Sequence, residues 1–281
     1  MSTRGGAAER PIYDPALALA FFRSGGRPQA VAQGATIFSE NEKSGALQLW
    51  RSRMYLLLGG EVSLLAKKRL IGTVRKGEIF GELAAIAHAP RSATAVARTP
   101  CRVIALDEAQ FERALQKKPA FALVLMGMMI GRLRETVGRL VAASALTEAA
   151  SVKESSAVDP ELLPQLAEGL TQDAPLHFDR GKVILREGQA GLRMYVVLEG
   201  RVAVSIGGTV VERLGPGGAF GEMALLERSM RAASVAAETD CSVLPINRDG
   251  FLALVKLSPA FAHGLLRTLA ERLKFLTARL A

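Results

Sequence analysis

Short apolar segments rich in β-branched residues alternate with glycine turns along most of the chain. In the stretch from Met194 to Ile206 (MYVVLEGRVAVSI), a glycine separates two such segments, as expected for adjoining strands of a small β-barrel. Further turn signals are glycine pairs and clusters, at 59–60, 207–208 and 215–218. This pattern predicts mainly short strands joined by tight turns.

The spacing of apolar residues becomes helical at two places. From Ala262 to Leu280, leucines recur every three or four residues, which predicts an amphipathic helix. The segment from Ala120 to Ala143 has the same periodicity. After this first helix, the sequence SVKESSAVDPELLPQ is polar and contains two prolines, which is typical of a linker.

The second half of the chain repeats the first. Matching residues are 140 positions apart from Met54 onward and 147 positions apart before it. The matched pairs include Tyr55 with Tyr195, Gly60 with Gly200, Glu82 with Glu222, Arg91 with Arg231, Cys101 with Cys241, Phe111 with Phe251, and Arg132 with Arg272. The shift in spacing places about seven additional residues between Glu40 and Met54 of the first copy. One fold is therefore used twice, with the loop 41–53 enlarged in the first copy.

Length and composition indicate a globular protein. The 281 residues suffice for two domains, and 49% hydrophobic and 22% charged residues are ordinary proportions. The apolar run from Ala120 to Gly131 is shorter than the ~20 residues that a membrane span requires. The N-terminus lacks the apolar core of a secretion signal. We therefore expect a cytoplasmic protein that does not engage a membrane.

The positive charge is concentrated in the first half. The net charge is +9, and residues 1–150 carry 21 Lys and Arg against 12 Asp and Glu, so they account for all of the excess. Such a surface favours an anionic ligand, a nucleic acid or an acidic partner, but an ordinary solvated basic face has the same composition. Charge alone does not decide among these.

Two matching segments carry the candidate chemistry. We call Phe80–Val96 (FGELAAIAHAPRSATAV) the first cassette and Phe220–Ala236 (FGEMALLERSMRAASVA) the second cassette. Each opens with Phe-Gly-Glu, predicted to start a short helix with free backbone N–H groups, and has an arginine nine residues after the glutamate. The glycine lets a ligand approach the backbone, the arginine fork suits a phosphate, and the ionised glutamate accepts from a hydroxyl such as a ribose 2′-OH. These groups indicate a nucleotide site; the alternative is that glutamate and arginine merely pair with each other.

Both cassettes resemble the phosphate-binding cassette of the cyclic nucleotide-binding domain family, which includes catabolite activator-type sensors and regulatory subunits of protein kinase A. The glycine-spaced strands and trailing helices are similar to the rest of that domain. The resemblance implies an α+β fold of two β-roll domains, each with flanking helices and a C-terminal amphipathic helix. The predicted parts are an N-terminal segment 1–27, a first domain 28–145, a linker 146–158 and a second domain 159–281.

By this resemblance, the glutamate binds the ribose, and the arginine and nearby backbone amides bind the cyclic phosphate. The predicted ligand-binding residues are Gly81, Glu82, Leu83, Ala84, Arg91, Ser92 and Thr136 in the first copy, and Gly221, Glu222, Met223, Ala224, Arg231 and Ala232 in the second. Ser92 stands where the second copy has Ala232, and its hydroxyl can contact the phosphate or favour guanine. Thr136 lies where family members contact the base, although an ordinary helix-surface threonine fits as well.

Other reactive residues point to no cofactor, no metal site and no enzyme. His88, His177 and His263 lack the spacing of metal ligands, and no nucleophile lies near a candidate base. The two cysteines make neither a disulfide framework nor a zinc site, and we expect both to pack inside strands.

No helix-turn-helix, kinase or channel segment accompanies the two copies. We therefore expect a receptor for a cyclic nucleotide, with cAMP favoured over cGMP, that signals to a protein partner through helix or domain rearrangement. Leu133, Val137 and Leu140 form an apolar stripe for a homodimer or for packing on their own barrel. The alternatives are a receptor for the cyclic dinucleotide c-di-GMP, a ligand-free interaction scaffold, and a nucleic-acid-binding regulator, for which the sequence offers the least support.

Overall fold

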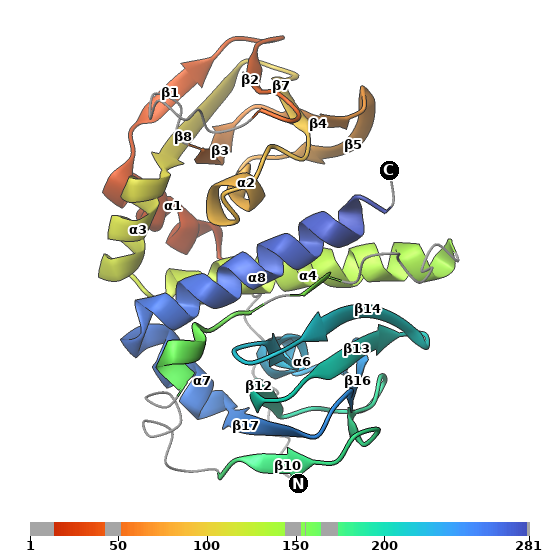
Figure 1. Ribbon diagram of the computed structural model, residues 1–281. Helices are drawn as coiled ribbons and strands as arrows, with labels where there is room; N and C mark the ends of the chain where they lie inside the picture. Colours follow the sequence, from red (N-terminus) through yellow and green to blue (C-terminus); the bar gives the residue numbers. More distant parts are fainter. Residues whose placement is uncertain (1–13, 43–51, 144–152, 155, 164–173, 280–281) are drawn as a thin grey trace, which may run out of the picture.

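The computed structural model describes residues 14–42, 52–143, 153–154, 156–163 and 174–279. Two β-domains lie on opposite sides of a layer of helices (Figure 1). Residues 43–51 of the enlarged loop and 146–152 and 155 of the predicted linker lie outside the described residues. The mixed α+β class and the two β-rolls predicted from the repeat are confirmed.

The first domain folds its strands into two four-stranded sheets, ordered β1-β8-β3-β6 and β2-β7-β4-β5. Its strands are β1 (Pro28–Val31), β2 (Thr36–Phe38), β3 (Arg53–Gly59), β4 (Val62–Ala66), β5 (Arg69–Val74), β6 (Ile79–Phe80), β7 (Thr94–Ala97) and β8 (Cys101–Asp107). All of these pairs are antiparallel.

The second domain repeats this topology in the sheets β10-β17-β12-β15 and β11-β16-β13-β14-β9. Its strands are β9 (Lys153–Glu154), β10 (Leu176–Phe178), β11 (Val183–Leu185), β12 (Arg193–Glu199), β13 (Val202–Ile206), β14 (Thr209–Leu214), β15 (Ala219–Phe220), β16 (Ser234–Ala237) and β17 (Cys241–Asn247). The glycine between β12 and β13 has φ 75°, and a Cβ there would lie 2.1 Å from the carbonyl oxygen of Asp240. Only glycine therefore fits Gly200 at this turn.

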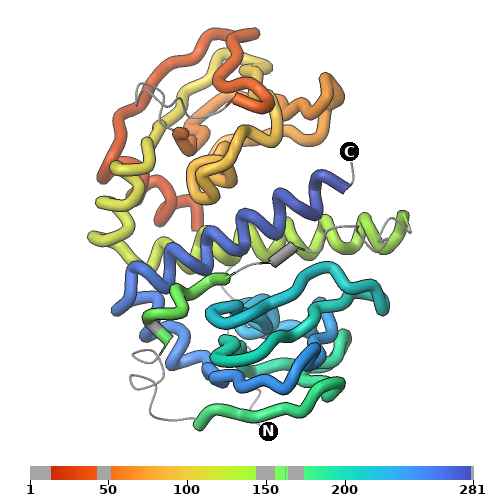
Figure 2. The backbone as a smooth tube through the Cα atoms, in the orientation of Figure 1, coloured from red at the N-terminus to blue at the C-terminus, as the bar shows by residue number. Residues whose placement is uncertain are grey.

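The helices are α1 (Pro15–Gly25), α2 (Glu82–Ile86), α3 (Glu108–Lys117), α4 (Phe121–Ala142), α6 (Glu222–Glu227), α7 (Arg248–Leu257) and α8 (Pro259–Thr277), with a 3-10 turn η1 (Pro160–Leu162). The two predicted amphipathic helices correspond to α4 and α8, which lie side by side between the β-domains (Figure 2). The Ser258 hydroxyl caps α8 by accepting from the N–H of Phe261. Among the described residues, no helix combines the length and apolar character needed to span a bilayer.

The hydrophobic core has three parts. Each β-roll encloses its own cluster, and Cys101 and Cys241 pack in these clusters as predicted. A third cluster lies in the helical layer and contains buried side chains from both domains. Phe21 and Phe22 of α1 belong to it, so residues before position 28 also pack into the fold. The two domains are therefore joined by a common apolar core.

The described part of the predicted linker packs on the second domain. β9 pairs in parallel with the outer edge of β14. Ala157 and Val158 are buried, and both of their N–H groups donate to the carbonyl oxygen of Gly217. Residues 153–154 and 156–158 therefore extend the second domain, a role that their polar sequence did not indicate.

The contact between α8 and this segment can be tested at a glycine. A Cβ on Gly264 would lie 1.9 Å from the carbonyl oxygen of Ala157, whereas a Cβ on the exposed Gly138 of α4 would meet nothing within 4 Å. We expect Gly264→Ala to destabilise the protein by about 1–3 kcal/mol through overpacking. Gly138→Ala, the matched control, should stabilise it by about 0.5–1 kcal/mol through helix propensity. Urea unfolding of both variants checks this, and equal changes would contradict the packing.

Candidate functional site

The two cassettes share one backbone arrangement. Each glycine after the β6 or β15 strand is left-handed, with φ 72° at Gly81 and 84° at Gly221, and a helix of one to two turns starts at the next residue. A Cβ at Gly221 would lie 2.7 Å from Arg231 Nη1, and a Cβ at Gly81 would lie 2.9 Å from Arg91 Nη1. The glycines are therefore required by the protein itself, for backbone conformation and for the approach of the arginine.

The arginines of the cassettes are buried and bind backbone carbonyls. Arg91 donates to the oxygens of Gly81 and Arg53 at 2.7 and 2.8 Å. Arg231 donates in the same way to Gly221 and Arg193, at 2.7 and 2.6 Å. Burial lowers the pKa of both guanidinium groups below its usual value, but an arginine remains protonated at neutral pH. Both side chains thus hold a positive charge in a defined orientation.

The glutamates pair with arginines outside the cassettes, so the alternative of a Glu–Arg pair within each cassette is not what the fold contains. Glu82, 1% exposed, forms an ion pair with Arg132 of α4. Glu222, 2% exposed, accepts from Arg272 Nη1 of α8 at 2.9 Å. Arg132 also donates to the carbonyl oxygen of Ile79, and Arg272 donates to that of Ala219. Both carbonyls lie on the strand that leads into the cassette helix.

The sequence pattern assigns no role in the site to these two helix arginines beyond their match in the repeat. The available signal was the repeat itself, because Arg132 and Arg272 are 140 positions apart like the cassettes that they serve. Neither spacing nor composition says which acidic residue a helix arginine reaches. The pairing ties each trailing helix to its own cassette.

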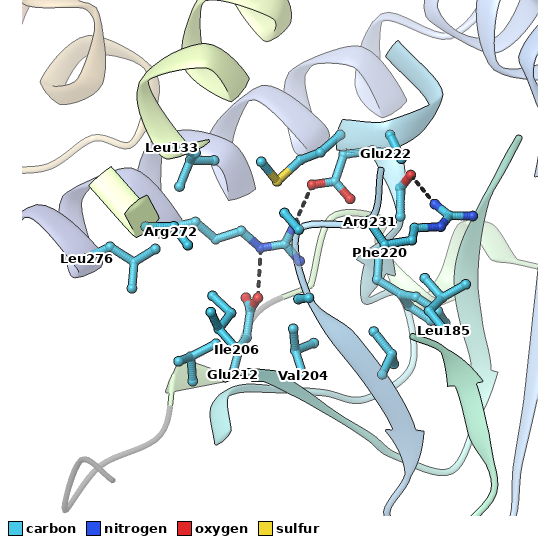
Figure 3. A pocket seen from close by; sticks show the side chains of 18 of the residues that line it. Leu133, Leu185, Val204, Ile206, Glu212, Phe220, Glu222, Arg231, Arg272 and Leu276 are labelled. Atoms are coloured by element: carbon cyan, nitrogen blue, oxygen red, sulfur yellow. Dashed lines mark hydrogen bonds and ion pairs between the residues drawn. The ribbon is translucent and has the colours of Figure 1, made fainter. Parts of the chain in front are cut away.

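The second domain adds another carboxylate to this arrangement. Arg272 Nε donates to Glu212 Oε2 on β14 at 2.8 Å, so its guanidinium lies between Glu212 and Glu222 (Figure 3). Burial by itself would lower the pKa of Arg272, but the attraction of the two carboxylates outweighs burial and raises it. In the first domain, Gly72 occupies the position of Glu212, and the Arg132 side chain is 39% exposed against 12% for Arg272. The second site is therefore more enclosed and more highly charged.

A cavity, partly open to solvent, lies above the second cassette. All six residues predicted for the second copy line it: Gly221, Glu222, Met223, Ala224, Arg231 and Ala232. Its apolar wall comes from the β-roll and from both long helices, with Leu133 and Val137 on α4 and Phe275 and Leu276 on α8. The cavity thus brings a buried carboxylate, a buried guanidinium and an apolar surface together in one concave site.

The predicted residues of the first copy differ in burial. Glu82, Ala84 and Arg91 are buried, and Leu83 packs against the helical core, whereas Ser92 is exposed. Thr136 is 9% exposed on α4, so it is not an ordinary surface threonine. Its counterpart in the repeat, Leu276, lines the second cavity, so the two copies differ at this position.

The apolar stripe on α4 serves neither of the two expected roles in this structure. Leu133 and Val137 line the cavity of the second domain, and Leu140 is completely buried in the common helical core. The second domain therefore covers the stripe. A second copy of the chain has no access to it in this conformation.

Comparison with known proteins decides the family. The family model described as cyclic nucleotide-binding domain matches residues 28–118 and 175–258, which is more than half of the chain. The chain belongs to the cyclic nucleotide-binding domain family. Both matched regions include their cassette, so the assignment covers each copy of the repeat.

Several relatives share this domain. The cAMP-dependent protein kinase regulatory subunit of Eremothecium gossypii is 31% identical over 202 residues, which are 72% of this chain and 39% of that protein. Its counterpart in Yarrowia lipolytica is 30% identical over 211 residues, 74% and 50% of the two chains. The Cyclic AMP receptor protein of Thermus thermophilus is 38% identical over 102 residues, which are 34% of this chain and 47% of that protein. The chain thus spans half or less of the length of these relatives.

Solved structures give a similar set of neighbours. A cAMP-bound structure of PfPKA-R is 26% identical, covers 84% of this chain and 74% of its own, and has a TM-score of 0.31. The catabolite activator protein of Thermus thermophilus is 33% identical and has a TM-score of 0.37. The match covers 43% of this chain and 58% of that chain. The family assignment rests on the sequence match, and these low scores add no argument to it.

The two helix arginines should differ in their contribution to stability. Arg272→Met leaves the buried Glu212 and Glu222 without their guanidinium, which should cost about 3–5 kcal/mol. Arg132→Met breaks one pair at a position that water reaches, and we expect a cost of about 1–3 kcal/mol. Urea unfolding at pH 7 measures both. Equal losses would show that Glu212 adds nothing to the network.

Proposed function

We propose that this protein is a non-enzymatic receptor for a cyclic nucleotide, with cAMP favoured over cGMP, and that the second cassette is the better-formed site. The observation that carries this proposal is that Glu222, Arg231 and apolar side chains line one and the same cavity. The names of the relatives, cAMP-dependent protein kinase regulatory subunit and Cyclic AMP receptor protein, support the choice of ligand.

The side chains suit the parts of such a ligand. A cyclic phosphate carries one negative charge, which the guanidinium of Arg231 can bind in this enclosed site. Arg272 holds Glu222 in a fixed orientation, and a carboxylate has further acceptor positions for a ribose hydroxyl. The base would lie against Phe275 and Leu276.

The preference for cAMP rests on what lines the wall of the second cavity. Leu133, Val137, Phe275 and Leu276 provide apolar surface without hydroxyl groups, and Ala232 stands after the arginine. Such a wall offers guanine no partner for its 2-amino group, N1–H and 6-carbonyl, which are more polar groups than the single amino group and ring nitrogen on the same edge of adenine, and unpaired polar groups lose affinity. The first copy carries hydroxyl groups at the corresponding positions, on Ser92 of the first cassette and Thr136 of α4, and need not share this preference.

We further propose that the receptor signals to a protein partner. Similarity to regulatory subunits of cAMP-dependent protein kinase makes a kinase catalytic subunit the first partner to test. A ligand that engages Glu222 acts on the residue that holds α8 to the cassette, so it can change the position of this helix.

Calorimetry with cAMP, cGMP and c-di-GMP tests the proposal. We expect cAMP to bind most tightly, and Arg231→Ala to weaken binding at the second site by about 100-fold, because a charged hydrogen-bonded contact is lost. Arg91→Ala should affect only the first site. The control is Arg228→Ala, which removes the same charge from an exposed position in the second cassette and should leave the affinity unchanged.

Each other outcome identifies a different function. Tighter binding of c-di-GMP would make the protein a cyclic dinucleotide receptor. No heat from any ligand, in protein shown by circular dichroism to be folded, would favour a ligand-free scaffold. Because the buried arginines also support the fold, Arg231→Lys serves as a second variant that keeps the charge but removes the fork.

A further inference from the structure

Helix α4 ends the first domain, but it also lies against the second cassette. α4 packs along α8 and contacts α6, while α8 contacts α2 of the first cassette. Each trailing helix is thus bound to its own cassette through a Glu–Arg pair and lies beside the cassette of the other domain.

Three consecutive residues of α4 contact both sites. Arg132 forms the ion pair with Glu82 in the first cassette. Leu133, 3% exposed, lines the second cavity, and Val137 lies there one turn later. Arg134 reaches the end of the second cassette helix. Because these residues follow one another on a regular helix, a shift of α4 at one site is also a shift at the other.

Arg134 makes two hydrogen bonds to the second cassette. Its Nε donates to Glu227 Oε2 at 2.8 Å, and its Nη2 donates to Ser229 Oγ at 2.7 Å. Glu227 is the last residue of α6 and is 13% exposed. Ser229 lies two residues before Arg231. The guanidinium of Arg134, a residue of the first domain, therefore holds the segment that carries Arg231, the proposed phosphate-binding residue.

The repeat does not reproduce this contact for the first cassette. Lys274 stands on α8 at the position of Arg134, and Ala87 and Ala89 stand at the positions of Glu227 and Ser229. Neither alanine has a side-chain acceptor. Among the described residues, the hydrogen bonds of Arg134 to the opposite cassette therefore have no counterpart at these positions of α8 and the first cassette.

We infer that α4 of the first domain is a working part of the second ligand site. Leu133 and Val137 complete its wall, and Arg134 is a positioning residue that keeps Ser229, Met230 and Arg231 in place for the phosphate. This inference rests on the proposed function, because it assigns parts to a nucleotide site. Leu133 and Val137 of α4 already line the cavity together with Glu222 and Arg231, so the hydrogen bonds of Arg134 stabilise the assembled site.

The experiment is a cAMP titration by calorimetry in the Arg91→Ala background, in which only the second site is read; Arg91→Lys replaces it if the alanine variant does not fold. Adding Arg134→Gln should raise the Kd about three- to tenfold, because a charged contact worth roughly 1 kcal/mol is lost. The matched control is Arg139→Gln on the same helix, where the arginine is exposed and pairs with Glu135. This control should leave the Kd unchanged.

Two further variants separate positioning from a general loss of stability. Glu227→Gln should raise the Kd like Arg134→Gln, and the two effects should not add in the double variant, as expected for one shared contact. Arg134→Lys should restore part of the affinity. Lys274→Gln, read at the first site in an Arg231→Ala background, should have no effect.

The possible failures are distinct. If cAMP binds in an Arg231-dependent manner but Arg134→Gln changes the Kd less than about twofold, the inference is overturned and the proposed function stands. Additive effects of Arg134→Gln and Glu227→Gln would also overturn it. If the parent protein does not bind cAMP at all, the proposed function fails and the inference fails with it.

Discussion

Glu82 and Glu222 are almost completely buried at the starts of the two cassette helices, and each is neutralised by an arginine from the helix that follows its β-roll. An unpaired buried carboxylate would cost several kcal/mol or lose its charge. The trailing helix must therefore lie where its arginine reaches the cassette. This requirement fixes α4 and α8 against their own domains, and it holds both glutamates in a defined orientation.

The arrangement of the two domains follows from the same helices. α4 and α8 have apolar surface beyond what one β-roll covers, and they bury it against each other and against the cassette helix of the opposite domain. The result is one apolar core that joins both domains, with each helix placed between two cassettes. A ligand that competes for a buried glutamate would therefore act on a helix that also packs against the other domain.

The two sites are unequal because a few positions of the repeat differ. Glu212, which has Gly72 as its counterpart, holds Arg272 from a second side, and Leu276 replaces Thr136 in the wall. The second site is consequently more enclosed and more apolar. These differences concern charge and shape at the two sites, whereas the strand order and the cassette backbone are the same in both copies.

The sequence by itself determined the repeat, the strands, both long helices and the membership of each cassette in a family, because these depend on local periodicity and on residues close together in the chain. Tertiary structure alone decided that Glu82 pairs with Arg132 and that Leu133 serves the second domain. The physical reason is that an amphipathic stripe shows which face of a helix is buried but not what covers it. Likewise, a charged residue does not reveal its partner until folding brings distant segments within hydrogen-bonding distance.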